Sequence, residues 1–180
     1  MTGTLGNNGD RKYYGKYAGT VLQNIDPEQR GRIQVSVPDA LSLVPSSWAE
    51  PCIPLAGPTG TPMGSYFVPP IGTSVWVEFE KGDIERPIWV GCRFGSVADV
   101  PPLALAGLPI SPSIVLQTGG QNTFMISDLP GPTGGILLKT TAGASISVTD
   151  TGIIIQNGRG ASISMVGPTV TINNGALTIT

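Results

Sequence analysis

The 180-residue sequence contains no histidine. Histidine is the commonest general base in enzymes and the commonest transition-metal ligand in proteins. Cysteine is nearly as scarce: Cys52 and Cys92 are too few for a disulfide framework or for a site made of cysteines alone. The two could pair if they were adjacent, but we expect two free, buried thiols in a protein made in a reducing compartment, with no metal or other cofactor.

Charge is also scarce. Only 12% of the residues are charged, against about 25% in typical globular proteins, and the net charge is −2. This composition offers no basic surface for nucleic acids. The first ten residues lack the apolar core of a signal peptide, and no apolar run approaches the ~20 residues that span a membrane as a helix. We expect synthesis in the cytoplasm.

Glycine and proline are abundant instead, with 25 and 17 residues, but they follow no Gly-X-Y repeat, so collagen is excluded. Beyond residue 113 they separate short segments, seven to twelve residues apart, in which Ile, Val and Leu alternate with Ser and Thr. Such spacing predicts a repetitive all-β structure. One face of each strand is predicted to carry the apolar core of a shaft, formed by Ile114, Leu116, Phe124, Ile126, Ile136, Leu138, Ile146, Val148, Ile153, Ile155, Ile163, Met165, Val170, Ile172, Leu177 and Ile179.

A single copy of this segment would have little interior and few charges to protect its strand edges. Three copies wound around one axis would bury the apolar faces and close the edges. We therefore predict an intertwined, triple-stranded β-helix in a homotrimer. The alternatives are a single-chain β-solenoid or one half of a β-sandwich.

The preceding segment is richer in aromatic and charged residues. Five predicted strands in about 80 residues indicate a small closed barrel; they are residues 15–22, 32–37, 48–53, 74–80 and 87–92. The predicted organisation is a flexible leader at 1–12, the barrel at 13–95, an extended Pro-rich linker at 96–112 and the shaft at 113–180.

Two groups of polar residues in the barrel are candidate catalytic or binding sites. Glu78 and Glu80 share one strand face, as a pair of glycosidase carboxylates could, but no pocket or acid partner accompanies them. Arg30 and Arg32 could belong to a basic strip for single-stranded nucleic acid, but acidic residues slightly outnumber basic ones in this segment. We predict no catalytic residue, no nucleic-acid partner and no enzyme activity.

Several motifs in the barrel resemble the OB-fold domain of contractile-tail spikes. They include NIDPEQRGRIQV at 24–35, PPIGT at 69–73, VWVEFEKGD at 75–83 and PIWVG at 87–91. The chain is similar to phage baseplate assembly protein V and to the valine-glycine repeat spikes of type VI secretion and extracellular contractile injection systems. The resemblance implies a homotrimeric central spike in the baseplate of a phage tail or injection particle. Its barrel would seat on hub and inner-tube proteins, and the spike would meet the target membrane only while puncturing it.

The sequence departs from some relatives in two ways. Some relatives carry a lysozyme domain where this chain has only the linker, so cell-wall hydrolysis is not expected. Some small phage spikes bind an iron ion through histidines at their point, and this chain cannot form such a site because it contains no histidine. Because the sequence stops within a predicted strand, we expect a separate PAAR-type conical tip protein to bind Leu177, Thr178, Ile179 and Thr180.

The rival hypothesis is a trimeric β-helical adhesin or tail fibre that binds a surface glycan. Such a shaft would be expected to expose aromatic side chains for stacking on sugars. After residue 113 the only aromatic residue is Phe124, which falls at a predicted inward position.

Overall fold

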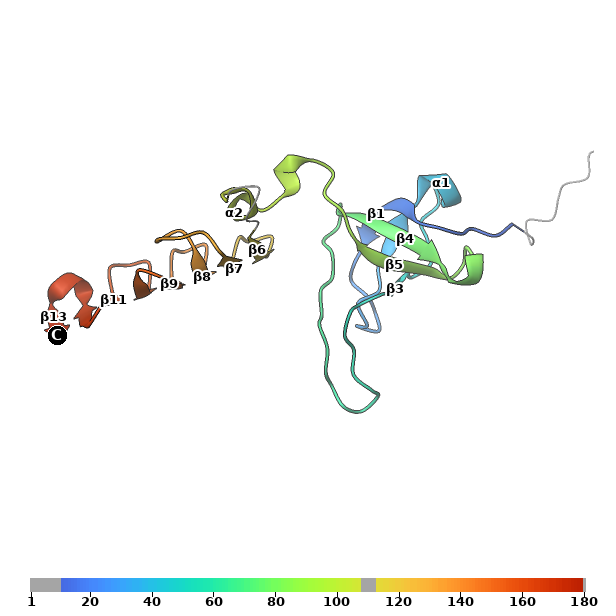
Figure 1. Ribbon diagram of the computed structural model, residues 1–180. Coiled ribbons are helices and arrows are strands. Elements are labelled where there is room, and N and C mark those ends of the chain that lie inside the picture. The colour runs from blue at the N-terminus through green and yellow to red at the C-terminus, as the bar shows by residue number, and fades with distance from the viewer. Residues whose placement is uncertain (1–10, 108–112, 180) are drawn as a thin grey trace, which may run out of the picture. The chain divides into compact units, whose positions relative to one another are not determined.

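The computed structural model describes residues 11–107 and 113–179 and is all-β with few helices (Figure 1). The chain divides into two compact units between Gly95 and Ser96. None of the described helices is long and apolar enough to cross a membrane. Thus the predicted all-β class is confirmed, and each unit contains one sheet.

The first unit is a curled five-stranded sheet in the order β2-β1-β4-β5-β3. Its elements are β1 (Tyr17–Gln23), β2 (Gln34–Ser36), α1 (Pro38–Leu41), β3 (Glu50–Pro51), β4 (Ser74–Phe79), η2 (Glu80–Gly82) and β5 (Pro87–Cys92). All neighbouring strands are antiparallel except β3 and β5, which are parallel.

Two of the five predicted strands are markedly shorter than expected, and a third is shifted. The strand expected at 32–37 is reduced to Gln34–Ser36. The strand expected at 15–22 lies at Tyr17–Gln23; it begins at Tyr17 because Gly15 has a φ of 88°, outside the extended region. The strand expected at 48–53 is reduced to Glu50–Pro51, in keeping with the missing backbone N–H of Pro51.

The edges of this sheet are joined by residues just outside the strands. Ile33 and Ala49 exchange two backbone hydrogen bonds, at 3.2 and 2.7 Å. The backbone N–H of Val35 donates to Ser46 Oγ at 3.0 Å. The curled sheet encloses a core of alternate strand residues and their neighbours, formed by Val21, Ile33, Val35, Val37, Ala49, Val75, Val77, Phe79 and Trp89.

The second unit begins with two short helical turns, η3 (Val97–Asp99) and α2 (Pro102–Leu105). The expectation of an extended linker is therefore wrong for its described part. Ser96 and Asp99 form a capping box, in which the Ser96 N–H donates to Asp99 Oδ2 at 2.9 Å. Proline at the first position of α2 favours a helix start. Residues 108–112 of the predicted linker lie outside the described residues.

An eight-stranded antiparallel meander follows, and each strand pairs only with its neighbours in sequence (Figure 1). The turn η4 (Asn173–Gly175) separates the last two strands. All eight predicted strands are present: β6 (Ile114–Gln117), β7 (Thr123–Ser127), β8 (Gly135–Lys139), β9 (Ser145–Thr149), β10 (Gly152–Gln156), β11 (Ser162–Val166), β12 (Thr169–Ile172) and β13 (Leu177–Ile179).

Candidate interaction surface

The strand register places all sixteen predicted shaft residues on one face of the meander. Residues directly opposite in an antiparallel pair lie on the same side of the sheet. The first continuous row is Ile114, Ile126, Ile136, Val148, Ile153, Met165, Val170 and Ile179. The second is Leu116, Phe124, Leu138, Ile146, Ile155, Ile163, Ile172 and Leu177.

We call these two rows the apolar face. In the single chain their side chains are exposed or half-buried: the exposed fraction is 62% for Ile114 and 38% for Ile163. Continuous apolar surface on this scale is typical of a surface that another protein covers. The apolar face is thus the strongest candidate interaction surface of the second unit.

The opposite face changes character along the meander. Its central row begins with Val115, Met125 and Leu137 and continues mainly with hydroxylic residues, among them Ser147 and Ser164. We call this the outer face. Its apolar part lies on β6–β8, so the first three strands carry apolar residues on both sides.

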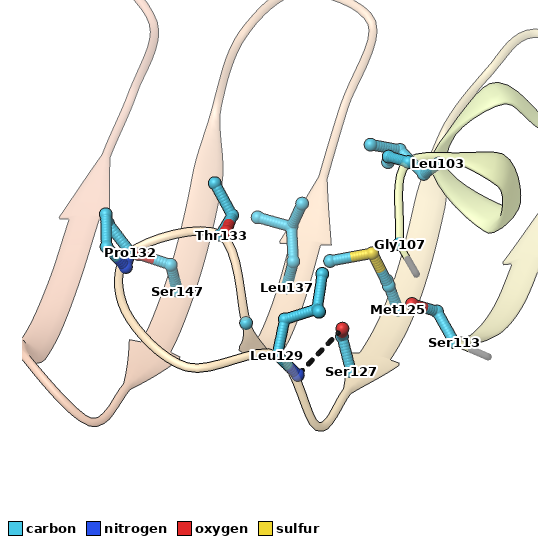
Figure 2. Close-up of a pocket in the computed structure, with 12 residues that line it drawn as sticks. Leu103, Gly107, Ser113, Met125, Ser127, Leu129, Pro132, Thr133, Leu137 and Ser147 are labelled. Atoms are coloured by element: carbon cyan, nitrogen blue, oxygen red, sulfur yellow. Dashed lines mark hydrogen bonds between the residues drawn. The ribbon is translucent and has the colours of Figure 1, made fainter. Parts of the chain in front are cut away.

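The loop at 128–134 folds over the part of the outer face that carries Met125 and Leu137 (Figure 2). Leu129 from the loop, Leu103 from α2, and Met125 and Leu137 from the sheet are among the residues that line a cavity of about 310 Å³. The Leu129 N–H donates to Ser127 Oγ at 3.4 Å. The Gly131 N–H donates to both carboxylate oxygens of Asp150, each at 3.0 Å, and this bond anchors the loop to the turn after β9.

Two family matches cover the two sheets. Residues 17–94 match the type VI secretion system/phage-baseplate injector OB domain, and residues 113–178 match the phage baseplate V C-terminal trimerisation domain. The chain belongs to the phage baseplate V spike family. No curated protein matches the chain.

Membership of the phage baseplate V family confirms the resemblance read from the barrel motifs. It assigns the chain to the baseplate of a phage tail or related injection machine, in a structural role. The match at 17–94 takes in β1–β5, and the match at 113–178 takes in nearly the whole meander. The apolar face therefore lies within the part of the chain that matches a trimerisation domain.

The predicted tip-binding residues lie on the last strand of the described sheet. Leu177 and Ile179 are exposed and end the two rows of the apolar face, and β13 pairs only with β12. Thr178 belongs to the same strand, and Thr180 lies outside the described residues. Binding of a tip protein here stays a prediction.

The two glutamates weighed as an acidic pair have separate partners in this family member. Glu78 Oε1 accepts from Lys16 Nζ at 2.5 Å, whereas Glu80 Oε2 pairs with Arg86 Nη2 at 2.7 Å. Each carboxylate is thus engaged in a surface ion pair. No group of three or more His, Cys, Asp or Glu residues within 11–107 and 113–179 could hold a metal ion.

The arginines weighed as a nucleic-acid strip are likewise paired with carboxylates. Arg30 contacts Glu28 at 2.9 Å and Glu50 at 2.6 Å, while Arg32 is buried against Asp26 at 2.7 Å. The hydrogen bond from Arg32, with further backbone donors and against the effect of burial, lowers the pKa of Asp26 well below its ordinary value. The same pairing raises the pKa of Arg32.

The cysteines are free, as predicted, but the expectation that both are buried is wrong, because each is exposed. Cys52 follows the two-residue strand β3, and Cys92 is the last residue of β5, so both cysteines lie at the end of a strand. Partial burial still raises the pKa of the Cys92 thiol, which favours the unreactive protonated form.

Sequence reasoning missed the second apolar cluster, on the outer face. Its signal was present in the runs at 124–126 and 136–138, where three consecutive residues are apolar. Alternation predicts one buried face, whereas a continuous apolar run predicts burial on both.

Proposed function

We propose that the chain forms a homotrimeric central spike whose shaft is built by packing three apolar faces around a common axis. The observation that carries this proposal is the register, which brings sixteen large apolar side chains into two unbroken rows that one chain leaves partly exposed.

Complete burial of an Ile or Leu side chain stabilises a protein by about 1.5–3 kcal/mol. Roughly half of each side chain remains to be covered, so each of the sixteen positions adds on the order of 1 kcal/mol on assembly. Three copies are the simplest closed arrangement in which every face is covered equally, and the match to a trimerisation domain supports that number.

The proposed action is mechanical. A shaft whose strands are hydrogen-bonded throughout resists axial load, and its largely hydroxylic outer face avoids ionic adhesion during passage through an envelope. The barrel unit seats the trimer on the hub and inner-tube proteins of the baseplate. Sheath contraction then drives the spike through the target envelope, without an enzymatic step.

We further propose that the exposed side chains of β13, with Thr180, bind a PAAR-type tip protein. Leu177 and Ile179 continue the apolar face to the last described strand, whose outer edge has no strand neighbour in the described sheet. An edge strand with exposed apolar side chains is suited to capping by a second protein.

The native mass of the purified full chain tests the central proposal. Light scattering at low micromolar concentration should give three times the chain mass of 18.6 kDa. A single-chain mass would overturn the spike proposal. A trimer that bound strongly on a glycan array would favour the adhesin alternative instead; Phe124 lies in the apolar face, which argues against it.

A further inference from the structure

Complete burial within the second unit is confined to one short stretch. Among its described residues only Thr123, Met125, Ser127 and Gly134 are buried, and all four belong to β7 or the loop that follows. Met125 retains an exposed fraction of 6%. Beyond Gly134 every residue whose burial the structure describes is exposed or half-buried.

We define a proximal segment, residues 114–139, and a distal segment, residues 145–179. The proximal segment holds one apolar side chain, Met125, that is buried without a second chain, and we call the covered site around it the proximal core. Met125 and Leu137 project from the outer face toward the overlying loop, and Leu129 from that loop lines the same cavity (Figure 2).

Two glycines at the end of this loop allow the chain to pack closely against its neighbours. A side chain at Gly134 would collide with the carbonyl oxygen of Leu129. Gly135 has a φ of 75°, and a side chain there would collide with the carbonyl oxygen of Val148 in the neighbouring strand. Gly134 therefore fits the loop onto its own segment, and Gly135 fixes how β8 meets β9, the first distal strand, so the register at this junction is specified by shape as well as by polarity.

The distal segment also has a close approach between strands, since a side chain at Gly152 would collide with the carbonyl oxygen of Met165, but none of its residues whose burial is described is buried. Its outer row offers Ser147, Ile154, Ser164 and Thr171, and one isoleucine among hydroxylic residues cannot form an apolar core; its apolar face is half-exposed. A period-two pattern resists a slip of one residue, which would reverse the faces, but a slip of two residues keeps the apolar face intact.

We infer that the proximal segment folds within each chain and sets the register, and that the distal segment orders only when three chains meet, so that the shaft assembles from residue 114 toward residue 179. This inference rests on the proposed trimeric shaft and adds to it a direction of assembly and an element that starts it.

Pulsed hydrogen exchange during refolding of the full chain tests the order directly. At two chain concentrations tenfold apart, amides of β7 and β8 should become protected at the same rate, because their folding is unimolecular. Amides of β10–β12 should become protected later, at a rate that rises with chain concentration. Protection of both segments in one concentration-dependent step would overturn the inference, as would earlier protection of the distal strands.

Two methionines provide a matched pair of variants. Met125 lies in the proximal core, and Met165 lies in the distal part of the apolar face. Met125→Ala should slow trimer formation by roughly tenfold or more while changing trimer dissociation little, as expected of a residue in a folding nucleus. Met165→Ala should leave the rate of trimer formation within about threefold and accelerate dissociation. Slower trimer formation in Met165→Ala, together with an unchanged rate of formation in Met125→Ala, would contradict the inference.

The two proposals fail in distinguishable ways. A single-chain native mass would remove the trimeric spike and this inference together. A stable trimer whose segments become protected simultaneously would leave the spike intact and remove the inference alone. If Met125→Ala does not fold, the exchange experiment on the unsubstituted chain still decides between these outcomes.

Discussion

Arg32 and Asp26 form a buried, doubly hydrogen-bonded ion pair at the turn that leads into β2. Arg32 Nη2 and Nε donate to Asp26 Oδ1 at 2.7 and 3.1 Å. The same carboxylate accepts the backbone N–H groups of Glu28, Arg30 and Arg32. One carboxylate thus holds the whole turn at 26–32 in shape.

This pair predicts a specific dependence of barrel stability on pH. The pKa of Asp26 is lower in the folded chain than its ordinary value of about 3.9. The ionised carboxylate therefore stabilises the fold fully above about pH 5, and this contribution is lost progressively as the pH falls toward the lowered pKa. Asp26→Asn should unfold at lower urea concentration at pH 7 and should lose less stability than the unsubstituted chain between about pH 5 and 2.

Tryptophan fluorescence can follow this transition, since Trp48, Trp76 and Trp89 all belong to the barrel unit. If the free energy of unfolding changed equally with pH in Asp26→Asn and in the unsubstituted chain, the stabilising role of the ionised Asp26 carboxylate would be contradicted.

The stability of the barrel unit also depends on Ile33. Its side chain is fully buried and its backbone bonds to Ala49 where the sheet edges meet. Ile33→Ala should lower the free energy of unfolding by about 2–5 kcal/mol. The control is Leu43→Ala at a side chain that is 98% exposed, for which a change within about 0.5 kcal/mol is expected in the same urea titration.

Adjacent residues on β11 distinguish the two faces of the shaft. Ile163 lies on the apolar face and Ser164 on the outer face. Ile163→Asp should abolish the trimer, because three carboxylates would be brought into an apolar core with no partner for their charge. Ser164→Asp should remain trimeric. Light scattering of both variants checks this, and loss of the trimer in both or in neither would rule out the proposed packing.

Gly134 is expected to be intolerant of a side chain for reasons of space alone, since its φ is not positive. Gly134→Ala would push the loop carbonyl of Leu129 away and disturb the proximal core, so the midpoint of thermal unfolding of the shaft should fall by several degrees. Gly119 has open space where a Cβ would be, which makes Gly119→Ala the matched control. Equal unfolding midpoints for the two variants would refute this.

Substitution of the exposed apolar residues of β13 should remove tip-protein binding without removing the trimer. In the double variant Leu177→Ser with Ile179→Ser, the trimer should form but should no longer co-purify with a co-expressed PAAR-type tip protein. Removal of residues 176–180 should have the same effect. Undiminished co-purification from a trimer of either variant would disprove the proposed site.

Much of the fold was predictable because its signals are local. Alternation of Ile and Val with Ser and Thr, interrupted by turn residues, located all eight strands of the meander and assigned sixteen residues to one face. Period-two geometry follows from the backbone itself, so no knowledge of the partners was needed. The barrel motifs were enough to indicate the baseplate V family, and the family matches confirmed it.

Other features arose from contacts between residues that no local pattern connects. The outer core depends on a loop folding back over β7 and β8, and the edge bridge depends on Ile33 meeting Ala49. The predicted extended linker gave way to two helical turns, one of them stabilised by the Ser96–Asp99 capping box. These contacts were decided by which segments the folded chain brings together in space.

The sequence by itself therefore determined where the strands lie and which of their residues share a face, because both depend on backbone geometry and side-chain polarity over a few residues. Only the tertiary structure decided which of those faces is covered within one chain. It covers part of the outer face of β7 and β8 with the loop at 128–134 and leaves the apolar face exposed or half-buried. The physical reason is that burial depends on the three-dimensional arrangement of distant segments, which local periodicity does not encode.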